Sequence, residues 1–380
     1  MDLEQFRQRF TENFSEFGEL GASVSVWQHG VEILSLAGGF RDQENTVGWT
    51  SETPVLFWSA TKGLAAATVL HVLQNEGLAI GHRVSHLWPE FAAAGKRDVT
   101  IGQLLSHQAG LCALSGAVPV NDHEAVSSAL AAQEPHWKPG TAHGYHPRTF
   151  GFLADEVVRR VTGLTLGSYF RQTFAEPLGL ALWIGIDPDL ADHVAPVFAA
   201  KTGLPKGDPF YTAFLTSDSL TARSFASPRG LHSASALNTT EARTASYPGF
   251  GGIGTARALA QFYAMLADGG RLGSRTFFSS ATLALMESTL ATGADRVLLM
   301  DTAFSAGFMR DPLGPDGRKL RCTFGPSLRA FGHPGAGGSL GFADPERGLA
   351  FAYVMNQMQP GVLPNPRSLR LIDSLYAACG

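Results

Sequence analysis

The stretch Phe57-Trp58-Ser59-Ala60-Thr61-Lys62 carries the strongest chemical signal in this sequence of 380 residues. A helix is predicted to begin near Ser59, so Ser59 and Lys62 are neighbours across one helical turn. A partly desolvated lysine has a lowered pKa and can accept the proton of a serine hydroxyl. The spacing therefore predicts Ser59 as a nucleophile and Lys62 as a proton acceptor. The alternative is an ordinary capped helix start, because a four-residue pattern with two free positions also occurs by chance.

A tyrosine follows in Gly144-Tyr145-His146-Pro147, on a predicted loop between turn residues. Such a loop can point the hydroxyl group of Tyr145 into a cleft. Beside the cation of a lysine the phenolate form becomes accessible and would act as a base for the serine. The alternative is a tyrosine packed between domains with its hydroxyl group satisfied.

A third element is the glycine-rich run that begins at Phe331-Gly332-His333-Pro334 and continues as Gly335-Ala336-Gly337-Gly338-Ser339. Glycine lets a backbone approach a bound group closely, so this strand can offer N–H donors to an oxyanion. The alternative is a tight hairpin that needs glycine for positive φ angles.

The composition excludes several classes of protein. Apolar residues make up 44% and charged residues 16%, and the formal net charge is -4, so a nucleic-acid partner is not expected. The three cysteines form no C-x-x-C pair, and His82 and His86 have no third ligand nearby, so neither a metal site nor a cofactor is predicted. The first residues do not resemble a signal peptide, and no run of eighteen apolar residues predicts a membrane span. We expect a cytoplasmic protein; its oligomeric state is not defined by the sequence.

The order of predicted elements indicates an α+β fold. A first helix over 2–17 and a hairpin turned by His29-Gly30 open the chain, and three strand-like runs and a last helix over 367–378 close it. One antiparallel sheet built from both ends is therefore predicted, flanked by helices, with an all-helical domain inserted. The expected α/β domain comprises 1–78 and 251–380, and the helical domain comprises 79–203. Residues 204–250 are expected to form a long loop region that lines the substrate pocket or, alternatively, packs without touching substrate.

Together these elements resemble the serine β-lactamase and penicillin-recognising superfamily, whose signatures include S-x-x-K and K-T-G. The class C-related branch, and within it the family VIII carboxylesterases, is most similar. Further matching stretches extend the resemblance from residue 57 to residue 343: Leu104-Leu105-Ser106-His107-Gln108-Ala109-Gly110-Leu111, Pro139-Gly140-Thr141, and Gly251-Gly252-Ile253-Gly254-Thr255-Ala256-Arg257.

The resemblance implies a site of named residues. Ser59 would be the acylated nucleophile, Lys62 and Tyr145 would handle the protons, and the backbone N–H groups of Ser59 and Ala336 would form the oxyanion hole. The candidate substrate contacts are Trp58, His146, His333, Gly335 and Gly337. His146 and His333 are expected near Ser59, where either could tune Tyr145 or touch substrate.

Two departures from the family pattern narrow the substrate. Tyr145-His146-Pro147 stands where β-lactamases usually have Tyr-x-Asn, so the amide that would hold the lysine is absent. His333-Pro334-Gly335 stands in place of Lys-Thr-Gly, and this removes a charge-assisted anchor for a carboxylate worth about 1.5–3 kcal/mol. A carboxylesterase acting on small or medium neutral esters is therefore predicted.

Other assignments remain open. A β-lactamase, a D-amino-acid peptidase or a transacylase would use the same acyl-enzyme on an ester or lactam, and a non-catalytic ligand-binding protein is a second class of alternative. Gly337-Gly338-Ser339-Leu340-Gly341 fits the G-x-S-x-G nucleophile motif, but a strand rather than a helix is predicted after Ser339. Ser217-Asp218-Ser219 approximates S-D-N but lacks its asparagine.

Overall fold

An eight-stranded antiparallel sheet forms the centre of the computed structural model, which describes residues 3–379. The predicted first helix and the predicted α/β domain extend beyond that range, because they include residues 1–2 or 380. The strand order is β2-β1-β13-β12-β11-β10-β9-β8. The bounds are β1 Gly21–Gln28, β2 Val31–Gly39, β8 Ala291–Ala294, β9 Asp301–Phe304, β10 Met309–Arg310, β11 Phe331–Pro334, β12 Leu340–Asp344 and β13 Leu349–Met355.

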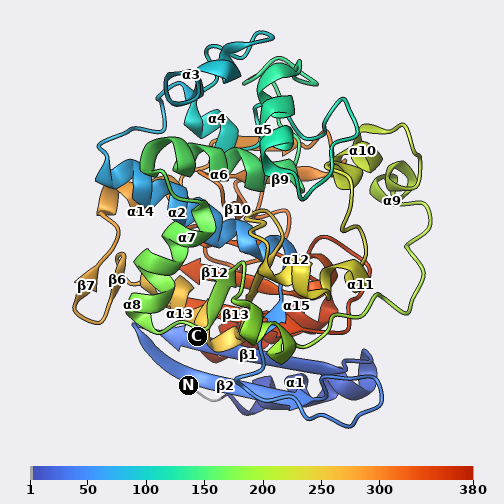
Figure 1. The fold of residues 1–380 in the computed structure, drawn as a ribbon. Coiled ribbons are helices and arrows are strands. Elements are labelled where there is room, and N and C mark those ends of the chain that lie inside the picture. Colours follow the sequence, from blue (N-terminus) through green and yellow to red (C-terminus); the bar gives the residue numbers. More distant parts are fainter. Residues whose placement is uncertain (1–2, 380) are drawn as a thin grey trace.

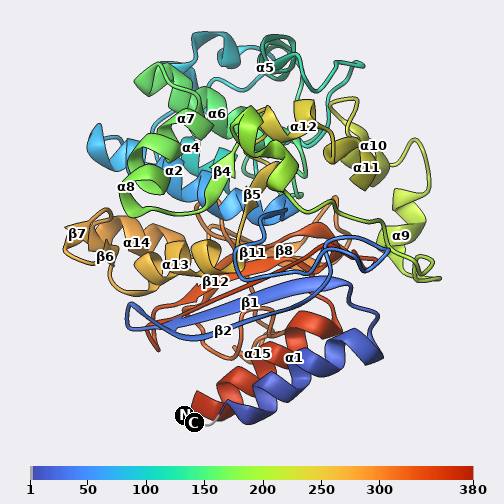
Figure 2. The ribbon, with the colours of Figure 1, turned by 60° about the horizontal axis from the view of Figure 1, so that its bottom comes forward.

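The two ends of the chain meet in this sheet. β1 pairs with β13 in a register that places Ala22 opposite Met355 and Gln28 opposite Leu349. β1 is buried along nearly its whole length because helices cover both faces of the sheet. Figure 2 shows α1 (Glu4–Glu16) and α15 (Pro366–Cys379) side by side below the sheet, and α13 (Ala256–Ala267) and α14 (Ser280–Glu287) above it. The predicted antiparallel sheet built from both termini is confirmed.

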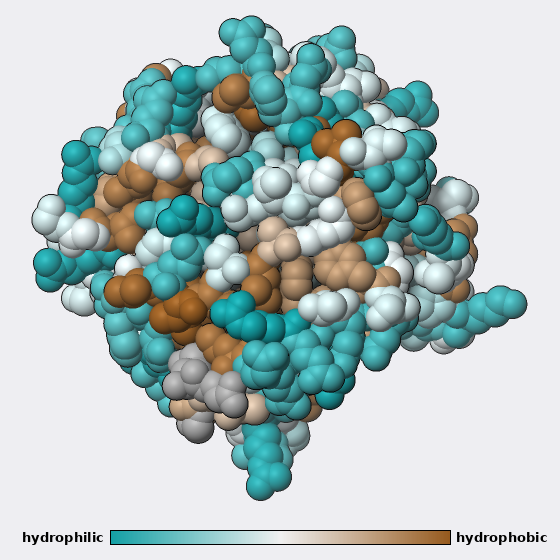
Figure 3. Space-filling model, turned by 90° about the horizontal axis from the view of Figure 1, so that it is seen from below, coloured by the Kyte–Doolittle hydropathy of each residue, from teal (hydrophilic) through white to brown (hydrophobic). Residues whose placement is uncertain are grey.

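The outer face of α1 is polar because this helix is amphipathic. Phe6 and Phe10 are buried against the sheet, whereas Glu4, Arg7 and Gln8 are exposed. Figure 3 views the molecule from this side and shows a mostly hydrophilic surface with smaller hydrophobic patches.

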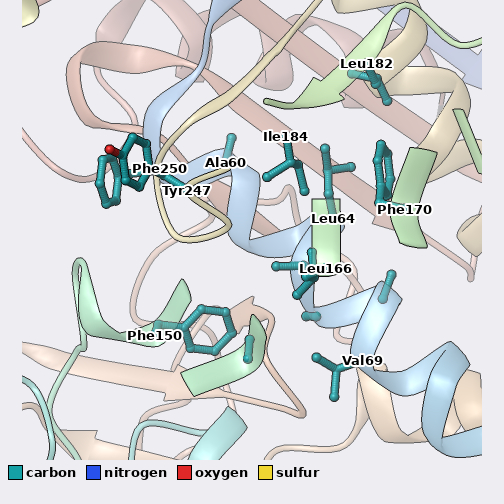
Figure 4. Packing of buried hydrophobic residues seen from close by; sticks show 14 of the residues in the cluster. Ala60, Leu64, Val69, Phe150, Leu166, Phe170, Leu182, Ile184, Tyr247 and Phe250 are labelled. Atoms are coloured by element: carbon teal, nitrogen blue, oxygen red, sulfur yellow. The ribbon is translucent and has the colours of Figure 1, made fainter. Parts of the chain in front are cut away.

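Helix α2 (Thr61–Asn75) lies between the sheet and the helical part of the molecule, as Figure 1 shows. Its residues from Thr61 to Leu73 are all buried, as expected of a helix that is covered on every side. A 3₁₀ turn, η1 (Trp58–Ala60), precedes it, so the regular α-helix begins two residues after Ser59. Figure 4 shows side chains of this core, with Leu64 of α2 near Ile184 and Phe170.

Short helices make up most of the inserted part of the chain. Their bounds are α3 Val84–Leu87, α4 Ile101–Leu105, α5 His123–Ala132, α6 Thr149–Thr162, α7 Leu166–Phe170 and α8 Glu176–Leu178, with the 3₁₀ turns η2 Pro89–Ala92 and η4 Pro188–His193 and the π-helical turn η3 Arg171–Ala175. A capping box opens α4, since the side chains of Thr100 and Gln103 each accept from the backbone N–H of the other.

Two smaller sheets complete the fold. β5 (Gly252–Gly254) lies between β3 (Val55–Leu56) and β4 (Leu182–Ile184), and it ties the segment before Ser59 to the middle of the chain. β6 (Arg271–Leu272) and β7 (Arg275–Thr276) form a hairpin.

The segment 204–250 is not a structureless loop, and this part of the prediction is corrected. It contains four short helices: α9 Pro209–Phe214, α10 Leu220–Ala226, α11 Ala234–Leu237 and α12 Thr240–Thr244. Each begins at a residue whose side chain accepts a hydrogen bond from a backbone N–H of the first turn, namely Asp208, Ser219, Ser233 and Thr239. The helices are too short to produce a detectable hydrophobic period.

Candidate active site

Ser59 lies in a turn that strand β5 holds through hydrogen bonds to residues on either side of it. The N–H of Phe57 donates to the carbonyl of Gly252 over 3.0 Å, and the N–H of Gly252 donates to Thr61 Oγ1 over 2.7 Å. Trp58 has a φ of 49°, a left-handed conformation that is uncommon for a residue with a side chain. The chain therefore turns sharply just before Ser59, and its local conformation is fixed by β5 as well as by α2.

Lys62 is fully buried and makes three contacts through its Nζ atom. Ser59 Oγ lies 3.1 Å away, and the backbone carbonyl oxygens of Pro147 and Gly249 each lie 2.7 Å away. Burial lowers the pKa of Lys62 well below its usual value, and the positive charge of Arg148 lowers it further. The carbonyl of Pro147 thus holds the lysine at a place where the family pattern predicts an asparagine amide.

This geometry gives the neutral amine a defined orientation. A neutral amine has two N–H groups and one lone pair. Two carbonyl acceptors at 2.7 Å take the two N–H groups, so the lone pair faces Ser59 Oγ at 3.1 Å. An amine oriented in this way has the geometry that a general base for the Ser59 hydroxyl would need.

Tyr145 lies beside Lys62, with the Nζ atom 4.9 Å from the centre of its ring. Its backbone N–H donates to both carboxylate oxygens of Asp295, at 3.0 and 3.1 Å, and this fixes the loop that carries it. Burial raises the pKa of Tyr145 above its usual value, and a hydrogen bond with Ser59 only partly opposes this. Burial therefore favours the neutral phenol over the phenolate form that the sequence motif predicted.

His146 lies behind Tyr145 rather than in contact with substrate space. Its Nε2 accepts from the N–H of Leu111 at 3.0 Å, and its Nδ1 lies 2.7 Å from the carbonyl of Gly144. Burial lowers the pKa of His146 to about 3. Both ring nitrogens are therefore used to hold backbone groups, and the structure does not support the predicted contact of His146 with substrate.

His333 is also buried, and its ring stacks on Tyr145 with a centroid distance of 5.9 Å. Burial lowers its pKa to about 3, so this side chain is neutral at physiological pH. His107 packs against the same tyrosine at 5.1 Å, edge to face. His107 and His333 thus limit the positions available to the phenol ring of Tyr145. His333 does not line the cavity, so its predicted substrate contact is replaced by contact with Tyr145.

Gly335 and Gly337 are needed for close packing around Ala336. A Cβ atom on Gly335 would lie 2.2 Å from the carbonyl oxygen of Phe57, so the end of β11 can approach the Ser59 turn only with glycine there. Gly337 has a φ of 87° and donates to the carbonyl of Gly361. Neither glycine lines the cavity, whereas Ala336 and Ser59 both do.

A cavity of about 400 Å³ opens beside Ser59. Its lining is mainly apolar and comes from both the sequence motifs and the segment that was predicted to be a loop. The lining residues are Trp58, Ser59, Tyr145, Pro147, Arg148, Phe214, Ser217, Ala222, Phe225, Ala226, Leu231, His232, Phe250, Ala336 and Val362. The predicted site residues Trp58, Ser59, Tyr145 and Ala336 therefore meet at one cavity, and α9 and α10 form part of its wall.

Arg148 is a functional candidate that the sequence reasoning missed. Its Nη1 donates to the carbonyl of Leu231 at 3.2 Å and lies 2.9 Å from His232 Nδ1, and its Nη2 donates to the carbonyl of Gly230. Burial lowers the pKa of Arg148 to about 10. The feature of the sequence that could have pointed to Arg148 is its position three residues after Tyr145.

Of the rejected motifs, Ser217-Asp218-Ser219 contributes Ser217 to the wall of the cavity, whereas Ser339 does not line it. Ser339 is fully buried and is followed by strand β12, so it is not a nucleophile on a strand-to-helix turn. Within residues 3–379, no three His, Cys, Asp or Glu side chains are grouped so that they could hold a metal ion. Over the same residues, no helix has the length and apolar character needed to cross a lipid bilayer.

Fold and site together define a hydrolase class in which a serine on S-x-x-K meets a tyrosine and a glycine-rich strand at one cavity. A family model described as Beta-lactamase matches residues 10–373, and the chain belongs to this family. A curated relative, Esterase/beta-lactamase LipL of Mycobacterium tuberculosis, is 33% identical over 350 residues, which are 89% of this chain and 77% of LipL.

Solved structures agree with this assignment. A novel penicillin-binding protein homolog from Caulobacter crescentus is 37% identical with a TM-score of 0.87, and the match covers 98% of this chain and 96% of the homolog. A family VIII carboxylesterase is 36% identical with a TM-score of 0.86, with the same coverage of 98% and 96%. The predicted β-lactamase-like fold is confirmed.

Proposed function

We propose that this protein is a serine carboxylesterase that forms an acyl-enzyme at Ser59 on small or medium neutral esters. The observation that supports this most is the Lys62 amine, held by two carbonyls with its third direction toward Ser59 Oγ. The similarity to LipL and to a family VIII carboxylesterase supports ester chemistry.

The acylation step follows from the positions of these groups. Lys62 accepts the proton as Ser59 Oγ attacks the ester carbonyl, and the oxyanion is stabilised by the N–H groups of Ser59 and Ala336. Tyr145, a neutral phenol, donates its proton to the departing alkoxide and is reprotonated from Lys62. The C–O bond to the alcohol breaks, and the acyl group remains on Ser59.

Deacylation uses the same groups in the reverse sense. A water molecule takes the place of the alcohol, and its proton passes through Tyr145 to Lys62 as the oxygen attacks the acyl carbonyl. Lys62 then returns a proton to Ser59 Oγ, 3.1 Å away, as the acid leaves. No cofactor enters either step.

The proposed preference for neutral esters rests on the absence of a lysine and a threonine from β11. In place of a lysine and a threonine it carries His333, buried and neutral, and Pro334, which has no N–H to donate. Arg148 supplies a positive charge to the cavity lining, but its Nη atoms already bind Gly230, Leu231 and His232. An anionic β-lactam therefore has no ready carboxylate anchor here.

The proposal is tested by comparing kcat/KM for p-nitrophenyl butyrate and for nitrocefin in the wild-type protein and in Ser59→Ala. We expect a clear preference for the butyrate ester, and loss of that activity in Ser59→Ala. A preference for nitrocefin would show a β-lactamase instead. Binding of either compound without turnover would support a non-catalytic ligand-binding protein.

A further inference from the structure

The two carbonyl groups that hold Lys62 come from chain segments about a hundred residues apart. One belongs to Pro147, just before α6, and the other belongs to Gly249, just before β5. The residue that follows each carbonyl is Arg148 in the first segment and Phe250 in the second. The guanidinium carbon of Arg148 lies 4.8 Å from the centre of the Phe250 ring, so these two side chains stack on each other.

The same two segments also touch through their backbones. A Cβ atom on Gly151 would lie 2.2 Å from the backbone nitrogen of Gly249, and a Cβ atom on Gly249 would lie 3.1 Å from the carbonyl oxygen of Arg148. The side-chain stack and the glycine contact therefore join the segments on either side of the Lys62 amine.

Neighbouring groups hold both Arg148 and Phe250 in place. Tyr247 stacks face to face on Phe250, with ring planes 12° apart and centroids 5.1 Å apart, and Figure 4 shows these two rings near Ala60 at the start of α2. The guanidinium of Arg148 bonds the carbonyls of Gly230 and Leu231. Among the described residues, Arg148 has no carboxylate within ion-pair distance, so its partners are the aromatic ring, these carbonyls and the ring of His232.

We propose that the stacked pair Arg148–Phe250 is a positioning clamp, which keeps the carbonyls of Pro147 and Gly249 at the spacing that directs the Lys62 amine toward Ser59. The clamp rests on the proposed role of Ser59 as nucleophile. Arg148 has a second effect, because its positive charge near Lys62 favours the neutral amine.

Three variants distinguish the effect of the aromatic stack from the effect of the Arg148 charge. Phe250→Leu removes the aromatic face and keeps the charge, Arg148→Met removes both charge and stack, and Phe250→Tyr keeps an aromatic face. Phe225→Leu is the matched control, since Phe225 also lines the cavity but does not adjoin a carbonyl that binds Lys62. For each variant, the rate of Ser59 labelling by a small fluorophosphonate and kcat and KM for p-nitrophenyl butyrate are measured from acid to alkaline pH.

We expect Phe250→Leu to lower the labelling rate and kcat by about 10- to 100-fold at the pH of maximal activity, because a small displacement of a base has effects of this size. The acid limb of its pH profile should stay in place. Phe250→Tyr should recover most of this loss, and Phe225→Leu should change KM more than kcat. Arg148→Met should lower the rate and also move the acid limb to higher pH.

Unchanged labelling and kcat in Phe250→Leu would overturn the clamp, as would equal losses in Phe250→Leu and Phe225→Leu. Fluorophosphonate labelling does not depend on the natural substrate. A wild-type protein that labels at Ser59 but hydrolyses no ester would contradict the proposed esterase and still allow the variants to test the clamp. A wild-type protein that does neither would contradict both.

Discussion

Lys62 combines burial with a full set of hydrogen-bond partners, and this combination determines its chemistry. A buried lysine without acceptors would be costly in either protonation state, whereas two carbonyls at 2.7 Å satisfy the N–H groups of the neutral amine. Because burial lowers its pKa well below the usual value, the base form is favoured at a lower pH than for an exposed lysine.

Lys62→Arg is expected to abolish most activity, because a guanidinium stays protonated and cannot accept the proton of Ser59. We expect kcat/KM for p-nitrophenyl butyrate to fall by about 10²- to 10⁴-fold. In the wild-type protein the same parameter should fall as the pH is lowered through the depressed pKa of Lys62, because the amine then becomes protonated. An acid limb that persists in the residual activity of Lys62→Arg would assign that titration to another group.

The sequence motifs predicted several side chains around Ser59, but they did not reveal Arg148 or the backbone contacts of Lys62. Trp58, Ser59, Tyr145 and Ala336 meet at one cavity, as expected from their motifs. The carbonyl of Gly249 was not predictable, because a backbone acceptor has no residue identity and its position depends on how two distant segments pack. The raised pKa of Tyr145 was not expected either, and it arises because burial outweighs the hydrogen bond with Ser59.

At the scale of elements, the end of β11 and the turn η1 carry the two N–H groups of the proposed oxyanion hole. Glycine at position 335 allows β11 and η1 to lie close together, because a Cβ atom there would be 2.2 Å from the carbonyl oxygen of Phe57. The N–H of Gly335 also donates to the carbonyl of Ser339 at 2.6 Å, which closes the short 3₁₀ turn η5 (Ala336–Gly338).

Gly335→Ala is therefore expected to push β11 away from Phe57 and to displace the N–H of Ala336. We expect kcat/KM to fall by about 10²- to 10³-fold, the usual effect of losing one oxyanion donor. Gly116→Ala is the control, because a Cβ atom at Gly116 would meet nothing within 4 Å. Equal activities of the two variants would show that the close approach of Gly335 does not support the oxyanion hole.

Elements with a clear hydrophobic period were predicted well, and short elements were not. The first helix α1, the hairpin β1–β2 and the last helix α15 lie close to their expected positions. Strands β8, β9 and β10 were missed because they have two to four residues each and owe their strand conformation to their neighbours. For α9 to α12, the capping residues Asp208, Ser219, Ser233 and Thr239 were the signal that could have revealed the helices.

At the scale of the whole molecule, buried neutral histidines link stability to pH. The pKa values of His146 and His333 are about 3 in the folded protein, below the value near 6.5 of an unfolded chain. Burial lowers the pKa of His107 as well. Above pH 6.5 these groups are neutral in both states, so they do not alter the pH dependence of stability there.

Acidification below pH 6.5 is expected to destabilise the protein, because the unfolded chain binds protons that the folded chain excludes. Each such histidine lowers the free energy of unfolding by about 1.4 kcal/mol per pH unit until its folded pKa is reached. Burial raises the pKa of Glu19 to about 7, so this carboxyl group increases the free energy of unfolding as the pH falls below 7. It is one group, and it opposes the three histidines. Urea unfolding midpoints measured at pH 7 and pH 5 check this, and a midpoint as high at pH 5 as at pH 7 would contradict it.

The most direct test of the central claim is to trap the acyl-enzyme. The wild-type protein is mixed with p-nitrophenyl butyrate, quenched with acid during turnover and mapped by peptide mass spectrometry, beside Ser59→Ala. We expect a butyryl ester on Ser59, next to the amine of Lys62 at 3.1 Å, and no adduct in Ser59→Ala. A butyryl group on a different residue, or undiminished turnover by Ser59→Ala, would contradict the account.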